Sequence, residues 1–229
     1  MVRLTNRDIR LLRDVALSHV LSRDQILALG YFGSVTRANT RLRGLIELGL
    51  LRRLETPFFS QSLYAVSRLA AEVVGGRIAP LIESRAGSPR FLQHALMVTE
   101  ARIMLLGRGA SEWRFEPQLW TSFLVAGKEH QVRPDGLALL PGKGGLAVEV
   151  DLGHVNPEKF AAKLYALNQF VLSGEAGRAW QVATVRLLTL TTGKLRAKRL
   201  LSLTPSTCAF EHVCQTFTEV NLQPIGSWS

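Results

Sequence analysis

The stretch SVTRANTRLRGLIELGLLRRL, Ser34 to Leu54, predicts a helix followed directly by a strand. Ser34 is a favourable N-cap, Gly49 is a favourable residue to end a helix, and the run after Gly49 is β-prone. At about 100° per residue, one side of this helix gathers the apolar residues Val35, Ala38, Leu42, Leu45 and Ile46. The opposite side gathers Thr36, Arg37, Thr40 and Arg43. The helix is therefore predicted to bury one face and to present the other to a partner.

Two shorter helices are predicted before this one, and a second β-prone run after it. Thr5 can cap the first helix, and Ser22 with Gln25 forms a capping box for the second. The second β-prone run, Ser62 to Val66, can pair with the first across a turn that contains Pro57. Three helices and a hairpin predict an N-terminal winged helix-turn-helix domain over residues 1–82.

The segment from Ser34 to Ile46 contains three arginines and no acidic residue, which favours a polyanion over water as its neighbour. We expect Thr36, Arg37, Thr40 and Arg43 to face the major groove of double-stranded DNA. Arg52 and Arg53 on the hairpin are expected to contact backbone phosphates. The alternative is an ordinary solvated helix face, or a winged helix that binds another protein.

The net charge of the whole chain also favours a polyanionic partner. The formal net charge is +10, and residues 1–88 contain thirteen Arg, no Lys and seven acidic residues. Arginine suits phosphates and guanine edges, although a GC-rich genome would give the same bias. The sequence has no apolar run of about 18 residues, so we expect neither secretion nor membrane insertion. Cys208 and Cys214 match no metal-binding spacing and are expected to stay reduced in the cytoplasm.

The second half of the chain predicts a separate α/β domain. Residues 83–90 are rich in Gly, Ser and Pro and predict a linker, and residues 91–229 predict the element order αβββαβ with a mixed sheet. The final helix and strand of this half are predicted in TGKLRAKRLL and AFEHVCQTF. The expected fold class is thus a two-domain α+β or α/β chain.

The stretch RPDGLALLPGKGGLAVEVDLG, Arg133 to Gly153, predicts a hairpin that carries three carboxylates. With the turn centred on Lys143, Asp135 would lie opposite Asp151, and Leu137 opposite Glu149. Side chains alternate by two along a strand, so Asp135, Glu149 and Asp151 would share one face. Carboxylates this close repel each other unless a proton or cation intervenes, and oxygen ligands suit Mg²⁺ or Mn²⁺. We therefore expect a cation site here.

Seven short motifs along the chain resemble the replication-relaxation family of plasmids and other mobile elements. They are LTNRDIRLL, ANTRLRGLIELGLLRRL, SLYAVS, QHALMVTEARI, RPDGLALL, LAVEVDLG and KFAAKLYAL, in this order. The resemblance implies a winged helix joined to a core similar to the restriction-endonuclease fold. In active nucleases of that fold, a Pro-Asp pair and a Glu-x-Lys motif bind Mg²⁺ and assist the attacking water.

Carried over by position, Pro134 and Asp135 match the first of these motifs, and Glu149 matches the glutamate. Asp151 stands where the lysine is expected. Some nucleases of this fold supply the lysine from the following helix, which makes Lys163 the catalytic candidate. Glu100 lies where such enzymes sometimes carry a further acidic ligand. For both Lys163 and Glu100, a solvated or ion-paired side chain is the alternative.

Three functions remain open from the sequence. The first is a DNA-binding protein of a mobile element that acts in replication, mobilisation or its regulation and has a degenerate nuclease-like domain. The second is a Mg²⁺-dependent DNA endonuclease or nickase. The third is an adaptor whose second domain forms a homodimer or contacts a relaxase or replication initiator.

Overall fold

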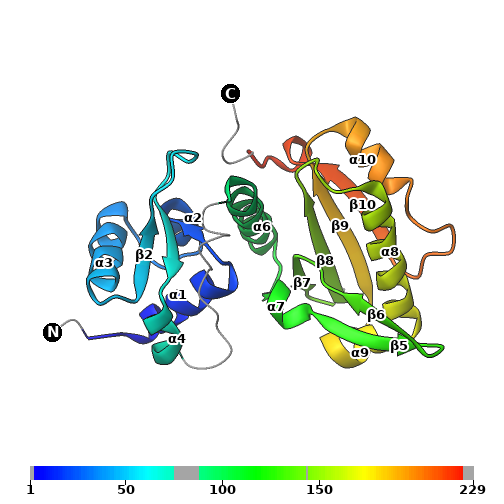
Figure 1. Ribbon diagram of the computed structural model, residues 1–229, viewed down its shortest axis with the longest axis horizontal. Helices are drawn as coiled ribbons and strands as arrows, with labels where there is room; N and C mark the ends of the chain where they lie inside the picture. Colours follow the sequence, from blue (N-terminus) through cyan, green and yellow to red (C-terminus); the bar gives the residue numbers. More distant parts are fainter. Residues whose placement is uncertain (1–2, 75–87, 143, 224–229) are drawn as a thin grey trace. The chain divides into compact units, whose positions relative to one another are not determined.

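The computed structural model describes residues 3–74, 88–142 and 144–223 (Figure 1). The described residues up to Ile103 form one compact unit, and Met104–Gln223 form a second. Most of the predicted linker, residues 83–90, lies outside the described residues. Helix α6 (Pro89–Gly107) contributes its residues up to Ile103 to the first unit. None of the helices in the described ranges has the length and apolar character needed to cross a bilayer.

Three capped helices begin the first unit, as the sequence predicts. They are α1 (Asn6–Leu17), α2 (Arg23–Ala28) and α3 (Val35–Glu47). Thr5 forms a capping box with Asp8, and Ser22 forms one with Gln25. The Ser34 side chain accepts a hydrogen bond from the amide of Arg37, and Gly49 after the helix has a φ of 70°. A positive φ is cheapest for glycine, which explains why α3 ends where it does.

A small antiparallel sheet completes this unit. Its strands are β1 (Leu21–Ser22), β2 (Leu51–Leu54) and β3 (Leu63–Val66), in the order β1-β3-β2, and helix α4 (Arg68–Val74) follows. One face, with Tyr64 and Val66, packs in the core shared with α1, α2 and α3. The other face, with Leu63 and Ala65, packs on the N-terminal part of α6. The sheet is thus covered on both faces.

The second unit is built on a five-stranded mixed sheet in the order β10-β9-β8-β7-β4. Strands β8 (Gly144–Asp151), β9 (Val185–Thr191) and β10 (Glu211–Thr216) are parallel, whereas β7 (Gly136–Leu140) and β4 (Glu112–Phe115) are antiparallel to their neighbours. Helix α8 (Pro157–Leu172) begins at the Asn156 cap and lies along the sheet (Figure 1). Its residues Phe160, Leu164 and Phe170 join the same core as Leu137, Ala147 and Leu187 of the strands.

The remaining elements of this unit connect the strands. Helix α10 (Lys194–Leu201) lies between β9 and β10 in the chain and packs on both strands. The shorter elements are α7 (Glu116–Leu119), α9 (Glu175–Trp180) and the 3₁₀ helix at Thr218–Val220. The mixed sheet and its flanking helices agree with the predicted α/β character of this half.

A second hairpin, β5 (Thr121–Val125) with β6 (Lys128–Val132), is absent from the predicted order αβββαβ. Its two turn residues, Ala126 and Gly127, both have positive φ, as in the turns that match the twist of paired strands. Alanine is uncommon at such a position, and the strand KEHQV lacks apolar alternation. These two features explain why the sequence pattern did not reveal the hairpin.

The register of the β7–β8 hairpin differs from the expected one by two residues. Gly136 lies opposite Val148 and Leu137 opposite Ala147, so Asp135 does not face Asp151 and Leu137 does not face Glu149. Gly142 and Gly144 both have positive φ and centre the turn one residue earlier than Lys143. A shift of two preserves the alternation, so the three carboxylates keep the same parity, and extending the register by one residue places Asp135 opposite Glu149 instead of Asp151.

Candidate nucleic-acid interface and carboxylate–lysine site

The outer side of α3 carries the residues predicted to contact DNA. Thr36, Arg37, Thr40 and Arg43 are exposed, whereas Ala38, Leu42 and Leu45 are buried in the core. Val35, assigned to the buried side, is 46% exposed in the first turn of the helix. The predicted division of α3 into two faces is otherwise present.

The third arginine of α3 holds the helix in place instead of facing outward. The Arg41 guanidinium donates two hydrogen bonds to Asp8, which is fully buried in α1, and one to the carbonyl of Arg3. Burial alone would raise the pKa of Asp8, but the bonds from Arg41 and Thr5 outweigh it and lower that pKa below its ordinary value. Asp8 therefore stays charged and ties α3 to the capped end of α1.

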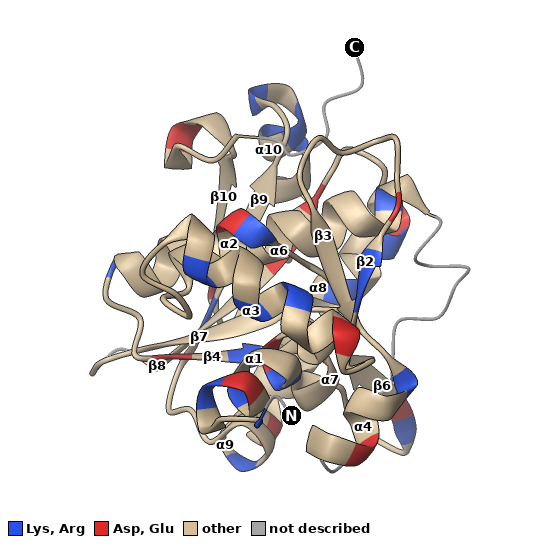
Figure 2. Cartoon of the chain, turned by 90° about the vertical axis from the view of Figure 1, so that its left-hand side faces the viewer, with Lys and Arg blue, Asp and Glu red and all other residues tan. Residues whose placement is uncertain are grey.

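Two hollows flank α3, and Arg43 lines both of them. The first is lined by Arg7, Phe32, Thr36, Arg37, Thr40, Arg41, Arg43, Gly44 and Glu47. In it, the guanidinium of Arg7 lies 4.7 Å from the centre of the Phe32 ring, a cation–π distance. The second, on the β2 side, is lined by Arg23, Asn39, Arg43, Ile46, Arg53, Ser62 and Tyr64. Figure 2 shows blue segments on α2, α3 and β2 in this unit.

The two arginines of β2 point to opposite faces of the small sheet. Arg53 pairs in register with Tyr64, whose face packs toward α1–α3, and Arg53 lines the second hollow. Arg52 pairs with Ala65, whose face packs toward α6. Both were expected to contact phosphates, but strand alternation puts only Arg53 on the α3 side. Arg23 was not among the expected contacts, although an arginine directly after a helix cap is well placed to remain exposed.

In the second unit, Asp135 directly precedes β7, and Glu149 lies in β8. The amide of Asp135 donates to the carbonyl of Val148 at 3.0 Å, and its carboxylate accepts from the amide of Val150 at 2.7 Å. Asp135 is thereby held against the backbone on both sides of Glu149. These two predicted site residues are brought together.

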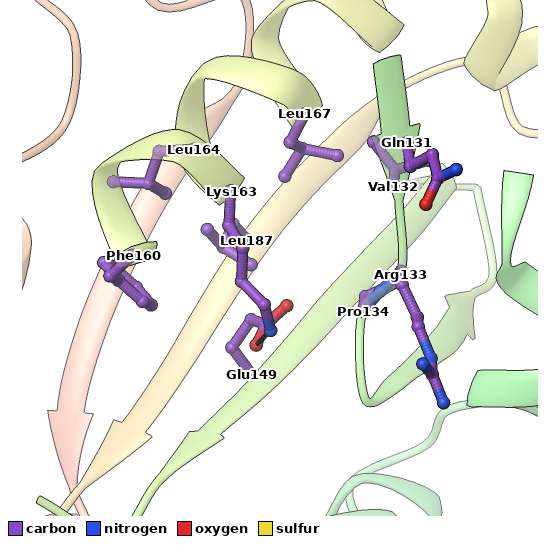
Figure 3. A pocket seen from close by; sticks show the side chains of 10 residues that line it. All are labelled: Gln131, Val132, Arg133, Pro134, Glu149, Phe160, Lys163, Leu164, Leu167 and Leu187. Atoms are coloured by element: carbon purple, nitrogen blue, oxygen red, sulfur yellow. Dashed lines mark hydrogen bonds and ion pairs between the residues drawn. The ribbon is translucent and has the colours of Figure 1, made fainter. Parts of the chain in front are cut away.

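Lys163 of α8 reaches this pair of acids. Its Nζ lies 2.6 Å from Oε2 of Glu149, whose side chain is only 13% exposed (Figure 3). Burial favours the neutral amine, but the negative charges of Glu149 and Asp135 prevail and raise the pKa of Lys163 above its ordinary value. Lys163 is therefore a firmly protonated ammonium group beside two carboxylates.

A small pocket opens beside this ion pair, between α8 and the segment Gln131–Pro134 (Figure 3). Its free volume is about 30 Å³, which holds a water or an ion but not a nucleotide. Arg133 lines the pocket but is directed away from Lys163, and pairs instead with Glu116 and with the ring of Trp120 at 5.2 Å. The geometry suits an ion or the edge of a phosphate.

Asp151, the third predicted carboxylate, is engaged elsewhere. It is 1% exposed, and both of its oxygens accept hydrogen bonds from Arg196 of α10, at 2.8 and 3.1 Å. Thr191 of β9 donates a further bond at 2.8 Å. Burial pushes the pKa of Asp151 upward, but the bonds from Arg196 and Thr191 outweigh it and lower that pKa. Asp151 thus forms a structural ion pair at the end of β8.

Glu100, the remaining metal candidate, belongs to the first unit. Its carboxylate accepts a hydrogen bond at 2.9 Å from Gln25, the residue that also closes the capping box of α2. Across the described residues, no three His, Cys, Asp or Glu side chains come together in a way that could hold a metal. Within the second unit, Asp135 and Glu149 are adjacent, whereas Asp151 is bound to Arg196.

Comparison with protein-family models gives a match to the replication-relaxation model over residues 12–185. Separate comparisons with curated proteins and with solved structures gave no match. The family match spans most of the chain and includes α3, the β2 and β3 strands, Asp135, Glu149 and Lys163. The chain belongs to the replication-relaxation family, and this membership implies a role in plasmid replication or relaxation.

Proposed function

We propose that the chain binds double-stranded DNA through α3 of an N-terminal winged helix, and that it acts in the replication or mobilisation of a mobile element or in its regulation. The observation that carries this proposal is the exposed face formed by Thr36, Arg37, Thr40 and Arg43 on a helix without an acid before Glu47. An α-helix fits the major groove, and arginine can bind guanine through two hydrogen bonds.

The anchoring of α3 supports the same proposal. A recognition helix needs a fixed orientation so that its side chains meet defined base edges. The Asp8–Arg41 pair and the buried side chains of Leu42 and Leu45 supply that fixed orientation. Family membership adds independent support, because replication and relaxation both act on DNA.

The test is a comparison of Arg37→Ala with Arg13→Ala on sites selected from randomised duplexes. Arg13 is an equally exposed arginine on α1 that lines neither hollow, so it controls for the loss of one charge. We expect Arg37→Ala to weaken binding to the selected site by about 1–3 kcal/mol and to relax its base preference. Arg13→Ala should leave the preference intact. Selection of no preferred sequence by the wild type would refute base recognition by α3.

A second candidate activity is Mg²⁺- or Mn²⁺-dependent DNA cleavage in a restriction-endonuclease-like second unit. It is favoured by one observation, the 2.6 Å contact between Lys163 and Glu149. Mg²⁺ is commonly bound through one or two carboxylates while it keeps several waters, and Asp135 with Glu149 fit that donor set. Such an ion would polarise a phosphate when bound. Lys163 would hold the phosphate and offset the negative charge that develops on it.

Metal binding and cleavage can be measured together on supercoiled and linear DNA with Mg²⁺, Mn²⁺ or chelator. If the second unit is degenerate, divalent ions raise the melting temperature of the wild type more than that of Asp135→Asn, and no DNA is cut. If it is active, metal-dependent cleavage is lost in Lys163→Ala and retained in Lys159→Ala. Lys159 lies one turn earlier on the same helix and is exposed, which makes it the matched control. Equal metal effects on wild type and Asp135→Asn would exclude the cation site.

A further inference from the structure

The hollow on the β2 side of α3 is formed by residues from every element around it. Arg23 stands at the first position of α2, Arg43 on α3 and Arg53 on β2. Ser62, directly before β3, and Tyr64 of β3 also line the hollow, and Tyr64 is the register partner of Arg53. The amide of Arg23 donates to the carbonyl of Ser62 at 3.1 Å, which fixes the start of α2 beside β3. Arg23 and Arg53 therefore approach the hollow from either side of β3.

The positive charge of this hollow is only partly compensated. Its lining contains three arginines, Asn39, Ser62 and Tyr64, but no acidic residue. In the part of the chain that the structure describes, Arg43 and Arg53 have no acidic partner, and Arg23 is paired with its exposed neighbour Asp24 at 3.1 Å. Three guanidinium groups around one hollow repel each other, and an anion held between them would relieve that repulsion.

The size and position of the hollow indicate which anion would fit it. Its volume is about 380 Å³ and it is open to solvent, whereas the pocket beside Lys163 offers about 30 Å³. Arg43 lines this hollow and the one on the opposite flank of α3. A helix in the major groove, which is about 12 Å wide, has one phosphate backbone along each flank. A backbone would therefore pass the hollow when α3 is docked.

We propose that Arg23, Arg43 and Arg53 together bind a backbone phosphate of the DNA strand that runs on the β2 side of α3. This inference rests on the proposed DNA binding by α3 and adds the strand contact that sets its register. The planar forks of arginine suit the phosphate oxygens, and Asn39 and Ser62 can donate further hydrogen bonds. The contact fixes position and carries no base preference.

The experiment measures binding of a duplex of arbitrary sequence as a function of salt, for wild type, Arg23→Ala, Arg53→Ala, the double variant and Arg52→Ala. Each lost phosphate contact should lower the slope of log K against log salt by about 0.9. We expect each single variant to lose up to that amount, and the double variant to lose at least as much as either. Arg52→Ala, one residue away on the opposite face of β2, should keep the wild-type slope. Melting temperatures check that every variant is folded.

Three outcomes overturn the proposal. One is that Arg23→Ala and Arg53→Ala keep the same slope of log K against log salt as the wild type while the wild type still binds DNA. This outcome would not contradict binding by α3. Another is an equal loss in Arg52→Ala, which means that general charge and not the hollow is responsible. The third is stabilisation of the wild type by inorganic phosphate, absent from Arg23→Ala, without a change in the DNA slope, which assigns the hollow to a small free anion. Failure of the wild type to bind any duplex removes the proposed function itself.

Discussion

At the scale of single residues, Asp151 and Arg196 show how a position expected to act in chemistry can serve stability. Asp151 stands where the resemblance to nucleases led us to expect a lysine, yet its side chain is 2% exposed and its oxygens are bound by Arg196 and Thr191. Removal of one member of a buried ion pair leaves the other charged without a partner, which usually costs about 3–5 kcal/mol. Breaking the Asp151–Arg196 pair should therefore lower the free energy of unfolding more than breaking an exposed ion pair would.

Arg196→Met should lower the free energy of unfolding by about 3–5 kcal/mol, because it strands the Asp151 carboxylate in the interior. The pair Arg186–Glu211, at 3.9 Å with both side chains exposed, provides the control in the same unit. Arg186→Met should change stability by less than about 1 kcal/mol. Urea unfolding at pH 7 measures both, and similar losses would show that burial does not distinguish the two pairs.

The same variant has a defined pH dependence. The folded pKa of Asp151 lies below its ordinary value of 3.8, so its stabilising contribution is complete above that value and is lost as pH falls through the folded pKa. In Arg196→Met the buried carboxylate can be neutralised by protonation. Burial raises the pKa of that carboxylate once Arg196 is gone, so the difference in stability between wild type and Arg196→Met should be largest above the raised pKa of the variant and shrink as pH falls from there through the lowered pKa of the wild type.

At the scale of elements, strand β7 has to pass close to Trp113 in order to bring Asp135 to Glu149. A Cβ atom at Gly136 would overlap the Trp113 ring, which is 8% exposed and cannot move into solvent. Gly136→Ala should therefore cost at least about 1–3 kcal/mol and displace Asp135 from the amide of Val150. Gly107→Ala is the control, since a Cβ there meets open space at a helical residue. Equal melting temperatures of the two variants in thermal unfolding would contradict the predicted overlap with the Trp113 ring.

The elements predicted best from the sequence are those fixed by local interactions. Thr5, Ser22 and Ser34 are confirmed as caps because each needs only an amide three residues away. The β7–β8 register was wrong by two residues because it depends on which glycines of the turn take positive φ. The pairing of Asp151 with Arg196, 45 residues later, depends on the parallel alignment of β8 and β9, which no local pattern reveals.

The candidate sites likewise contain a part that the sequence predicts from local periodicity and a part that depends on how separate elements pack. The exposed face of α3 follows from helical periodicity alone, and the structure agrees with it for Thr36, Arg37, Thr40 and Arg43. The second hollow could not be predicted, since Arg23, Arg43 and Arg53 meet only once three separate elements have packed. The sequence suggested that Lys163 could serve as a substitute lysine, but its contact with Glu149 depends on how α8 lies across the sheet.

At the scale of the whole molecule, the two units carry different kinds of positive charge. Residues 1–88 have arginine as their basic residue, without lysine, and six of these arginines line the two hollows that flank α3. In the second unit, several cations are committed to internal partners, Lys163 to Glu149, Arg178 to Glu175 and Arg196 to Asp151. The first unit is therefore the better candidate for the main share of electrostatic attraction to DNA.

The ion pair between Asp151 and Arg196 also restricts how the protein can evolve. The matched family region ends at Val185, so Asp151 lies inside it and Arg196 lies outside. A lysine at position 151 would meet the guanidinium of Arg196 in a buried site, and two like charges there would be more harmful than either one alone. A single substitution at position 151 therefore cannot introduce a Glu-x-Lys motif in this chain without a charge clash. We expect the two positions to change together, so that relatives with lysine at the first carry an uncharged or acidic residue at the second.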